Sequence, residues 1–351
     1  FTFGNISSNP IPSWNRGFTA PVIIDYKYTI DQLIKIMSSD TDEFNQYNAA
    51  QDLYFNIILG LVEDLSSNRE LELDSNFVKG FGELLNNSKI DEAFKAYALS
   101  MPGQMDVNEK LSLYSFENVK LAISFVKETL ATTFSNDFES LYDRMMDTSF
   151  ELDAKSMGKR ALKNTCLSYL TSSKTPISFK IAKDQYYNST NMNDEISSLK
   201  EIVHNFPEQK SEFILSFYKK WKNEPLVMQT WLSVQASAPY ITIDDIKHLE
   251  DVDIYDSKVP NFVRSILRTY VRTNPSLVNK PDGSGYKFLV DRIIEIDTYN
   301  PSLASGLAKS LNHIKKIDSD RASILKSELN RLLGSKLSKD TFEVVSKNLN
   351  G

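Results

Sequence analysis

The sequence is poor in the features that mark secreted and membrane proteins. It contains 1 cysteine, Cys166, which cannot form a disulfide within the chain and therefore favours a reducing compartment. The longest apolar runs, such as residues 57–62, fall far short of the roughly 20 residues that a membrane-spanning helix needs. The N-terminal residues lack the basic start and apolar run of a secretory signal. We therefore expect a cytoplasmic protein that does not enter a membrane.

Motifs for catalysis are missing as well. The 3 histidines stand at positions 204, 248 and 313, so the zinc-binding pattern His-Glu-x-x-His cannot occur in the chain. None of the 12 glycines completes a dinucleotide-binding fingerprint or a phosphate-binding loop. We therefore predict that the chain has no catalytic residue, no cofactor site and no metal site of its own.

The charge balance argues against nucleic acid as a partner. The chain has 40 Lys and Arg residues against 46 Asp and Glu residues, a net charge of -6, whereas binding by counterion release needs clustered cations. The densest basic cluster, residues 218–222, is typical of the solvated face of a helix. With 41% hydrophobic and 25% charged residues, the composition is that of a soluble globular protein.

Two weaker chemical signals have structural explanations. Asp244 and Asp245 begin an acidic segment around His248, which could present metal ligands on one helix face. We prefer the alternative, an exposed helix whose acidic first turn suits the helix dipole. Cys166 lies on an apolar stripe, so we interpret it as a core residue and not as a reactive thiol.

The first part of the chain differs from the rest. Residues 1–3 and 18–26 alternate or carry β-branched side chains, and a turn-rich segment at residues 7–13 separates them, which predicts two short strands. Two strands without further partners are marginally stable in water. We therefore predict that residues 1–26 are the terminal strands of a truncated β-sandwich domain, and that residues 27–351 form a separate helical domain.

From Thr29 onward the hydrophobic pattern has a helical period. Thr29 and Gln32 form a capping-box pattern, and apolar residues then recur every three or four positions from Phe44 to Leu65. Pro207, Pro225, Pro260 and Pro301 stand where a first-turn proline begins a helix. Such signals predict about sixteen helices and no parallel sheet. Because no strict repeat period is present, we expect an all-α, irregular right-handed superhelix of paired helices.

Several passages resemble a known family. They are SWNRGFTAPV at 13–22, DQL at 31–33, NAAQ at 48–51, KRALKNTCL at 159–167, LVMQTW at 226–231, QAS at 235–237, DGSGYKFLV at 282–290 and NP at 300–301. In this order they resemble the C-terminal portion of aminopeptidase N type zinc metallopeptidases, which belong to the gluzincins. The resemblance begins at the end of the family's third domain, a β-sandwich, and continues through its fourth, helical domain.

The resemblance implies a zinc exopeptidase that removes N-terminal residues from short peptides. In such enzymes a His-Glu-x-x-His motif and a further Glu bind the zinc, and a Gly-x-Met-Glu-Asn loop recognises the free amino end. Both would lie in domains that precede Phe1, since neither motif occurs in this chain. The helical domain, inactive alone, would cover the active site and control access. Its partners would be those missing domains and short peptide substrates.

The resemblance also implies three substrate-binding residues. Arg264, with its neighbour Asn261, matches an arginine that faces the peptide on the leaving side of the scissile bond. Ser302 matches a position at the rim of the pocket for the N-terminal side chain. Gly306 stands where a related bacterial enzyme has a second cavity arginine, which makes this chain's cavity less positive.

A hypothesis of a different class is a free-standing helical solenoid that binds a protein partner. The predicted strands at residues 1–26 distinguish the two hypotheses, because a free-standing scaffold has no reason to begin in the middle of a sheet.

Overall fold

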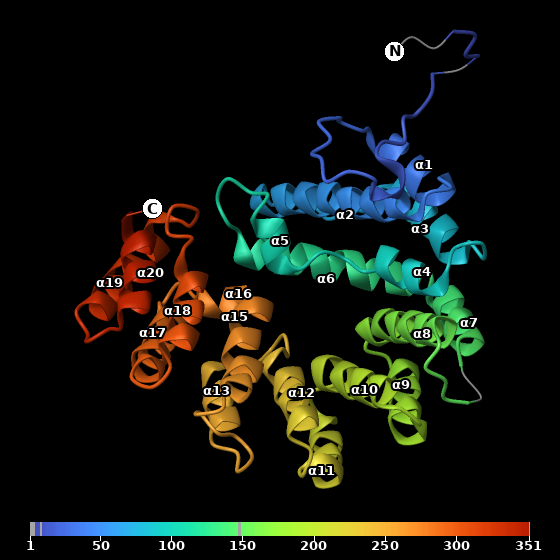
Figure 1. Ribbon diagram of the computed structural model, residues 1–351. Helices are drawn as coiled ribbons and strands as arrows, with labels where there is room; N and C mark the ends of the chain where they lie inside the picture. The colour runs from blue at the N-terminus through green and yellow to red at the C-terminus, as the bar shows by residue number, and fades with distance from the viewer. Residues whose placement is uncertain (1–3, 8, 147–148, 351) are drawn as a thin grey trace. The chain divides into compact units, whose positions relative to one another are not determined.

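The computed structural model describes residues 4–7, 9–146 and 149–350, and from residue 30 onward these form helices joined by short connections (Figure 1). No strand occurs in these ranges. The chain divides into two compact units, which we describe separately. Unit 1 comprises residues 1–102 and 122–178, and unit 2 comprises residues 103–121 and 179–351. The expected all-α class is confirmed.

Unit 1 starts with a short 3-10 turn and continues in helices. Its elements are η1 (Arg16–Phe18), α1 (Ile30–Ser39), α2 (Glu43–Ser66), α3 (Ser75–Asn86), α4 (Glu92–Ala98), α7 (Ser135–Arg144) and α8 (Ala154–Ser172). Two helices pass from one unit to the other: α6 (Phe116–Thr133) and α9 (Pro176–Asn188).

Unit 2 holds the remaining helices. They are α5 (Gln104–Asn108), α10 (Met192–Asn205), α11 (Lys210–Trp221), α12 (Pro225–Ala236), α13 (Ile243–Glu250), α14 (Pro260–Val263), the π-helix η2 (Arg264–Arg268), α15 (Thr269–Thr273), α16 (Pro275–Val278), α17 (Ser284–Asp297), α18 (Pro301–Ala308), the 3-10 turn η3 (Lys309–Leu311), α19 (Ser319–Leu333) and α20 (Lys339–Asn350). None of the described helices is long and apolar enough to cross a membrane.

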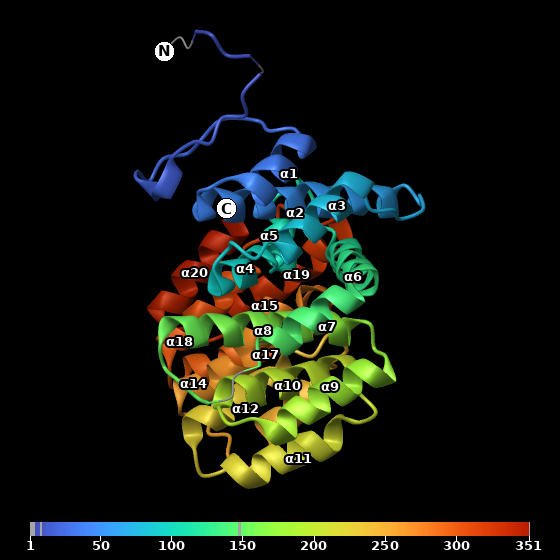
Figure 2. The ribbon, with the colours of Figure 1, turned by 90° about the vertical axis from the view of Figure 1, so that its right-hand side faces the viewer.

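The first helices begin where their capping residues predict. The Thr29 hydroxyl accepts a hydrogen bond from the Gln32 backbone N–H at 3.2 Å, and the Gln32 side chain accepts one from the Thr29 N–H at 3.0 Å. This reciprocal pair satisfies two N–H groups that a helix start otherwise leaves without partners. α1 then packs against both α2 and α3 (Figure 2). Its buried side chains are Leu33, Ile36 and Met37.

An aromatic cluster forms the core of unit 1. Phe138 of α7 stacks on Tyr169 of α8 with ring centroids 4.5 Å apart, and Phe81 of α3 contacts both rings. The buried Tyr169 hydroxyl donates a hydrogen bond to the Leu99 carbonyl at 2.6 Å. Gly158 allows α8 to approach α4 closely, because an added Cβ would lie 3.0 Å from the Ala93 nitrogen.

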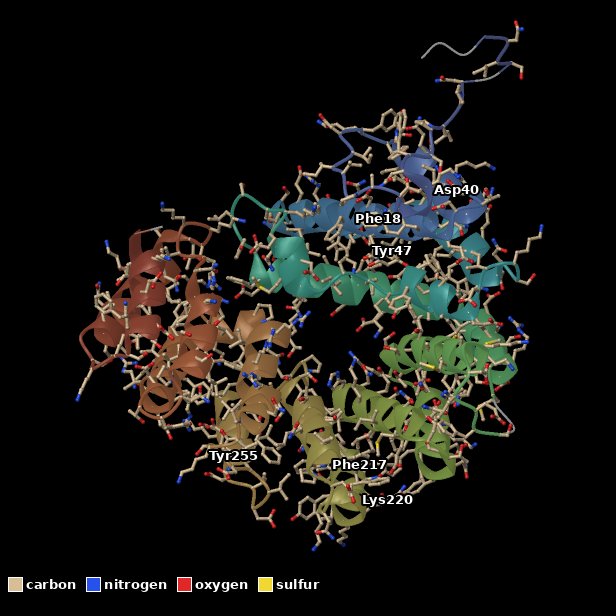
Figure 3. All side chains as sticks on the ribbon, viewed as in Figure 1. Phe18, Asp40, Tyr47, Phe217, Lys220 and Tyr255 are labelled. Carbon is tan, nitrogen blue, oxygen red and sulfur yellow. The ribbon has the colours of Figure 1, made fainter. Side chains whose placement is uncertain are left out.

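The predicted strand over residues 18–26 does not form. Those residues are neither helix nor strand apart from the end of η1, and the other predicted strand, residues 1–3, lies outside the described residues. A strand requires a partner that supplies ladder hydrogen bonds, and no described segment pairs with this one. The segment instead lies beside α1 and α2. Phe18 packs on Phe44 of α2 with ring centroids 4.9 Å apart, and Arg16, just before the segment, pairs through Nη1 with Oδ1 of Asp40, just after α1, at 2.7 Å; Figure 3 labels Phe18 and Asp40.

Three of the four predicted proline starts are confirmed. Pro225, Pro260 and Pro301 each open a helix, at the first position of α12, α14 and α18. Pro207 does not, because it lies in a turn and α11 begins at Lys210.

In unit 2, residues 103–121 are joined to residues that follow about two hundred positions later. The Tyr114 backbone N–H donates to the Lys316 carbonyl at 2.6 Å, and Lys316 Nζ donates to Glu109 Oε2 at 2.6 Å. His313 is buried beside the stacked ring of Tyr114, with ring centroids 5.8 Å apart. These contacts hold the connection after α18 against the start of the unit.

Candidate functional site

The predicted site residue Arg264 lies in a helix that changes its winding. α14 begins at Pro260, continues without interruption as the π-helix η2 from Arg264 to Arg268, and returns to α-helical winding in α15. The buried residues of this stretch are Phe262, Val263, Ser265, Ile266, Leu267 and Tyr270. One side of the helix is therefore anchored in the core of unit 2 while the other carries exposed side chains.

A side chain of the neighbouring helix α12 stabilises the π turn. The Ser233 hydroxyl lies 3.0 Å from the Ser265 carbonyl and 3.0 Å from the Gln229 carbonyl of its own helix, so the two carbonyls share its one proton, and it lies 3.5 Å from the Thr269 hydroxyl. A π turn disturbs the regular hydrogen-bond ladder of the helix, and such turns occur frequently at functional sites. Ser233 therefore supplies a hydrogen bond to the backbone where that ladder changes.

Arg264 and Asn261 form the one pair of predicted site residues that is in contact. Arg264 Nη1 donates a hydrogen bond to Asn261 Oδ1 at 3.0 Å, and both side chains are exposed. Within the described chain, Arg264 makes no ion pair. The asparagine thus restrains the guanidinium while most of its N–H donors still face solvent.

The segment before this helix is stabilised by a partly buried ion pair. Arg292 Nη2 lies 2.6 Å from Glu250 Oε2. Burial raises the pKa of the Glu250 carboxyl, although Arg292 acts in the opposite direction. Burial and the charge of Glu250 together raise the pKa of Tyr255, which Figure 3 labels. Its ring contacts that of Phe262 of α14, with 6.5 Å between the ring centroids. The start of α14 therefore packs on the connection that follows α13, which begins beside the Arg292–Glu250 ion pair.

Ser302 and Gly306 lie on a different helix, α18. Ser302 is exposed in its first turn and makes no hydrogen bond to Asn261 or Arg264 in the part of the chain that is described. Gly306 is also exposed, and a Cβ added there would meet no heavy atom within 4 Å. This position therefore has room for the larger side chain that the resemblance associates with it.

The acidic segment near His248 does not form a metal site. Asp245 completes a capping box with Thr242, and Asp244 pairs with Lys247 at 3.0 Å. Asp253 accepts a hydrogen bond from the Tyr218 hydroxyl at 2.8 Å. Across residues 4–7, 9–146 and 149–350, no group of three His, Cys, Asp or Glu side chains could hold a metal ion. The residues present here therefore do not fit the zinc that the resemblance implies.

Cys166 is a core residue, as its apolar stripe predicts. It has no exposed surface, and burial raises the pKa of its thiol to about 12, so the reactive thiolate is not formed at neutral pH. The exposed guanidinium of Arg264 offers N–H donors and no acceptor, so it suits binding of carbonyl or carboxylate oxygens.

Sequence reasoning missed the π turn. Arginine, serine, isoleucine and leucine at residues 264–268 fit an α-helix equally well, and the side chain that supports the π turn, Ser233, comes from a distant part of the sequence. Four-residue spacing of arginines is visible in the sequence, but spacing alone does not indicate the winding of the helix.

Comparisons with known proteins give a consistent result. A family model described as "Domain of unknown function (DUF3458_C) ARM repeats" matches residues 30–350. The chain is 28% identical over 355 residues to aminopeptidase N of Escherichia coli strain K12, with 99% of this chain and 40% of that protein covered. Aminopeptidase N of Haemophilus influenzae is 27% identical over 351 residues, with the same two shares.

A solved structure is similar over the whole chain. It is the crystal structure of Legionella pneumophila aminopeptidase A in complex with aspartic acid, with a TM-score of 0.87 and 27% identity, covering 100% of this chain and 42% of that one. The chain thus spans about two fifths of the length of the relatives it matches. The chain belongs to the family of DUF3458_C ARM-repeat domains, and it is similar over nearly its whole length to part of the aminopeptidases of these bacteria.

Proposed function

We propose that the chain is the substrate-access domain of a zinc-dependent aminopeptidase that removes N-terminal residues from short peptides. The observation that carries the proposal is the match of 99% of this chain to 40% of an aminopeptidase N. The chain itself cannot contain His-Glu-x-x-His, because its 3 histidines stand far apart. The proposal therefore assigns zinc and catalysis to other domains of the same polypeptide, and makes the isolated chain inactive.

Within this proposal, the exposed Arg264 binds the peptide on the leaving side of the scissile bond. Asn261 restrains the guanidinium through the 3.0 Å hydrogen bond, and Ser302 contributes to the rim of the pocket for the N-terminal side chain. A guanidinium presents N–H groups in a fork that suits carboxylate and carbonyl oxygens.

Residues 1–26 would adjoin the end of the preceding β-sandwich domain. Support comes from large apolar side chains that this segment exposes, among them Ile23, which is 99% exposed, and Val22, which is 54% exposed. Such residues on one short segment are typical of a surface that another part of the polypeptide covers. The single buried cysteine, Cys166, is consistent with a cytoplasmic enzyme.

Release of N-terminal residues from tripeptides and amino-acid amides, measured with the full-length polypeptide and with the 351-residue chain, tests the proposal. We expect metal-dependent activity of the full-length polypeptide and none of the chain alone. A full-length polypeptide that binds no zinc and releases no amino acid would contradict the proposal and favour a helical scaffold that binds a protein partner.

A further inference from the structure

The helix that carries Arg264 also carries two further exposed arginines, Arg268 and Arg272. Residues 257–281 contain five cations and no Asp or Glu, in a chain whose net charge is -6. The five cations are Lys258, Arg264, Arg268, Arg272 and Lys280. This segment is thus a local excess of positive charge on a negatively charged protein.

The three arginines lack the carboxylate partners that other arginines of the chain have. Arg292, Arg321 and Arg331 each pair with two carboxylates at distances of 2.5 to 2.9 Å. In the described part of the chain, no ion pair involves Arg264, Arg268 or Arg272. Three exposed guanidinium groups on one short helix repel one another, so an anionic ligand would stabilise them.

The π turn brings these side chains closer to one line. In an α-helix, a step of four residues overshoots a full turn by about 40°, so a row at this spacing drifts around the axis. A π turn, with its i to i+5 bonds, has more residues per turn and rotates less per residue. The step from Arg264 to Arg268 falls within η2, so the overshoot of that step is reduced.

The spacing of the stripe matches an extended peptide. Arg268 and Arg272 are about 6 Å apart along the helix axis, since each α-helical residue rises about 1.5 Å, and the π-helical step from Arg264 to Arg268 is shorter. In an extended chain, side chains on the same face are two residues, or about 6.5 Å, apart. Carboxylates at alternate positions of an extended peptide can therefore each meet one guanidinium.

We propose that Arg264, Arg268 and Arg272 form an anion-binding stripe for extended acidic peptides with carboxylates at alternate positions. The inference rests on the proposed function in one respect, that Arg264 faces the peptide on the leaving side of the scissile bond. Arg268 and Arg272 then extend this contact toward the peptide's C-terminus and select substrates with Asp or Glu there.

Binding to the full-length polypeptide of an N-acetylated peptide, Gly-Glu-Gly-Glu-Gly-Glu with an uncharged fluorophore, tests the stripe by fluorescence anisotropy. The acetyl group removes the free amino end, so the probe is bound without being processed by an aminopeptidase. We expect the double variant R268Q/R272Q to bind the probe at least tenfold more weakly at low salt. Salt should weaken binding to the unaltered protein, because it screens exposed charges.

Two matched controls separate the stripe from general attraction. The variant K219Q/K222Q removes the same charge from exposed lysines of unit 2, and we expect it to change probe binding less than twofold. A probe with the order Gly-Gly-Gly-Glu-Glu-Glu has equal charge but places successive carboxylates on opposite faces, and it should bind several-fold more weakly. Circular dichroism of both variants checks that they remain folded.

Equal losses in the two double variants, or equal binding of the two glutamate probes, would overturn the stripe. These outcomes are independent of hydrolysis. A full-length polypeptide that releases no amino acid but binds the alternating probe through Arg268 and Arg272 would contradict the proposed function and leave the stripe supported.

Discussion

In the part of the chain that the structure describes, Arg264 is restrained by the side-chain amide of Asn261 and makes no ion pair, which leaves its charge available for the ligand that we propose. We expect Arg264→Ala in the proposed full-length aminopeptidase to raise KM for tripeptides about tenfold, the effect of losing one solvent-accessible charge-assisted hydrogen bond. Amino-acid amides do not extend past the leaving group, so their KM should change less than twofold. Steady-state kinetics with both substrates, and with Lys219→Ala as an exposed control, measures this contrast. Equal losses on both substrate types would mean that Arg264 acts on the fold.

Gly306 offers a second test at the residue scale, because it lies within α18 and faces open space. Gly306→Ala should stabilise the protein by about 0.5 to 1 kcal/mol, since alanine loses less backbone entropy in a helix than glycine. The matched control is Gly285→Ala in α17, where the added Cβ would lie 2.2 Å from the Val278 carbonyl oxygen and should destabilise. Denaturant unfolding measures both. A destabilising Gly306→Ala would show that the position is not open.

His313 predicts how stability depends on pH. Burial lowers its pKa from 6.5 to about 4, while its Nε2 lies 2.6 Å from Asn279 Oδ1. Below pH 6.5, His313 binds a proton in the unfolded chain, whereas in the folded chain it stays neutral until the pH reaches about 4. Protonation therefore favours the unfolded chain, and the free energy of unfolding falls as pH falls from 6.5 to about 4. Within this pH range, the free energy of unfolding falls by up to about 1.4 kcal/mol per pH unit.

The free energy of unfolding at pH 7 and pH 5, compared between the unaltered protein and His313→Gln, isolates this contribution. We expect the variant to lose less stability between the two pH values. The exposed His248→Gln serves as control and should keep the full dependence. The same pH dependence in all three proteins would contradict a buried, neutral His313.

The candidate residues themselves could be predicted only through the family resemblance. An arginine three residues after an asparagine has no distinctive pattern, and the hydrogen bond between Asn261 and Arg264 follows from helical spacing once the helix is known. Ser233 could not be predicted as a neighbour of the site, because tertiary packing brings α12 to the π turn.

At the scale of elements, one carboxylate anchors the C-terminal helix. Asp297, at the end of α17, accepts hydrogen bonds from the Ser338 N–H at 2.5 Å, the Ser338 hydroxyl at 2.6 Å and the Thr341 hydroxyl at 2.5 Å. Asp297→Ala removes the acceptor of three buried or partly buried donors, which should cost about 1 to 3 kcal/mol. We expect faster hydrogen exchange throughout α20.

Asp340→Ala is the matched control, because this carboxylate lies in the first turn of the same helix and is exposed. Its effect on unfolding should be within about 0.5 kcal/mol. If Asp297→Ala and Asp340→Ala destabilised the protein equally, negative charge near the start of α20 would account for both effects. The hydrogen bonds that Asp297 accepts from Ser338 and Thr341 would then not be needed to explain the loss.

Helices that capping residues or hydrophobic spacing mark in the sequence could be predicted. Structure that depends on contacts between distant parts of the chain could not. The capping box at Thr29 and the long stripe of α2 correctly predicted where α1 starts and how α2 buries its face. Residues 18–26 have a strand-like composition, but a strand depends on a partner, and in the described chain this segment instead lies on α1 and α2. The composition of a segment indicates its tendency to form a strand, but it does not show whether a partner strand is present.

At the scale of the whole molecule, the sequence carries more information in scattered motifs than in any repeat. The sequence has no strict repeat period. Short passages from residue 13 to residue 301 nevertheless resemble one family in order, and the family model matches residues 30–350. The positions of the 3 histidines exclude His-Glu-x-x-His from these residues. The proposed function assigns zinc binding and catalysis to other domains, and this assignment defines the central test.

The coding sequence upstream of Phe1 tests the central claim most directly. We predict an open reading frame that continues in that direction and encodes His-Glu-x-x-His, a further glutamate and Gly-x-Met-Glu-Asn within the preceding few hundred codons. A start codon close to Phe1, with no such motif in the same frame, would contradict the assignment of this chain to a zinc aminopeptidase.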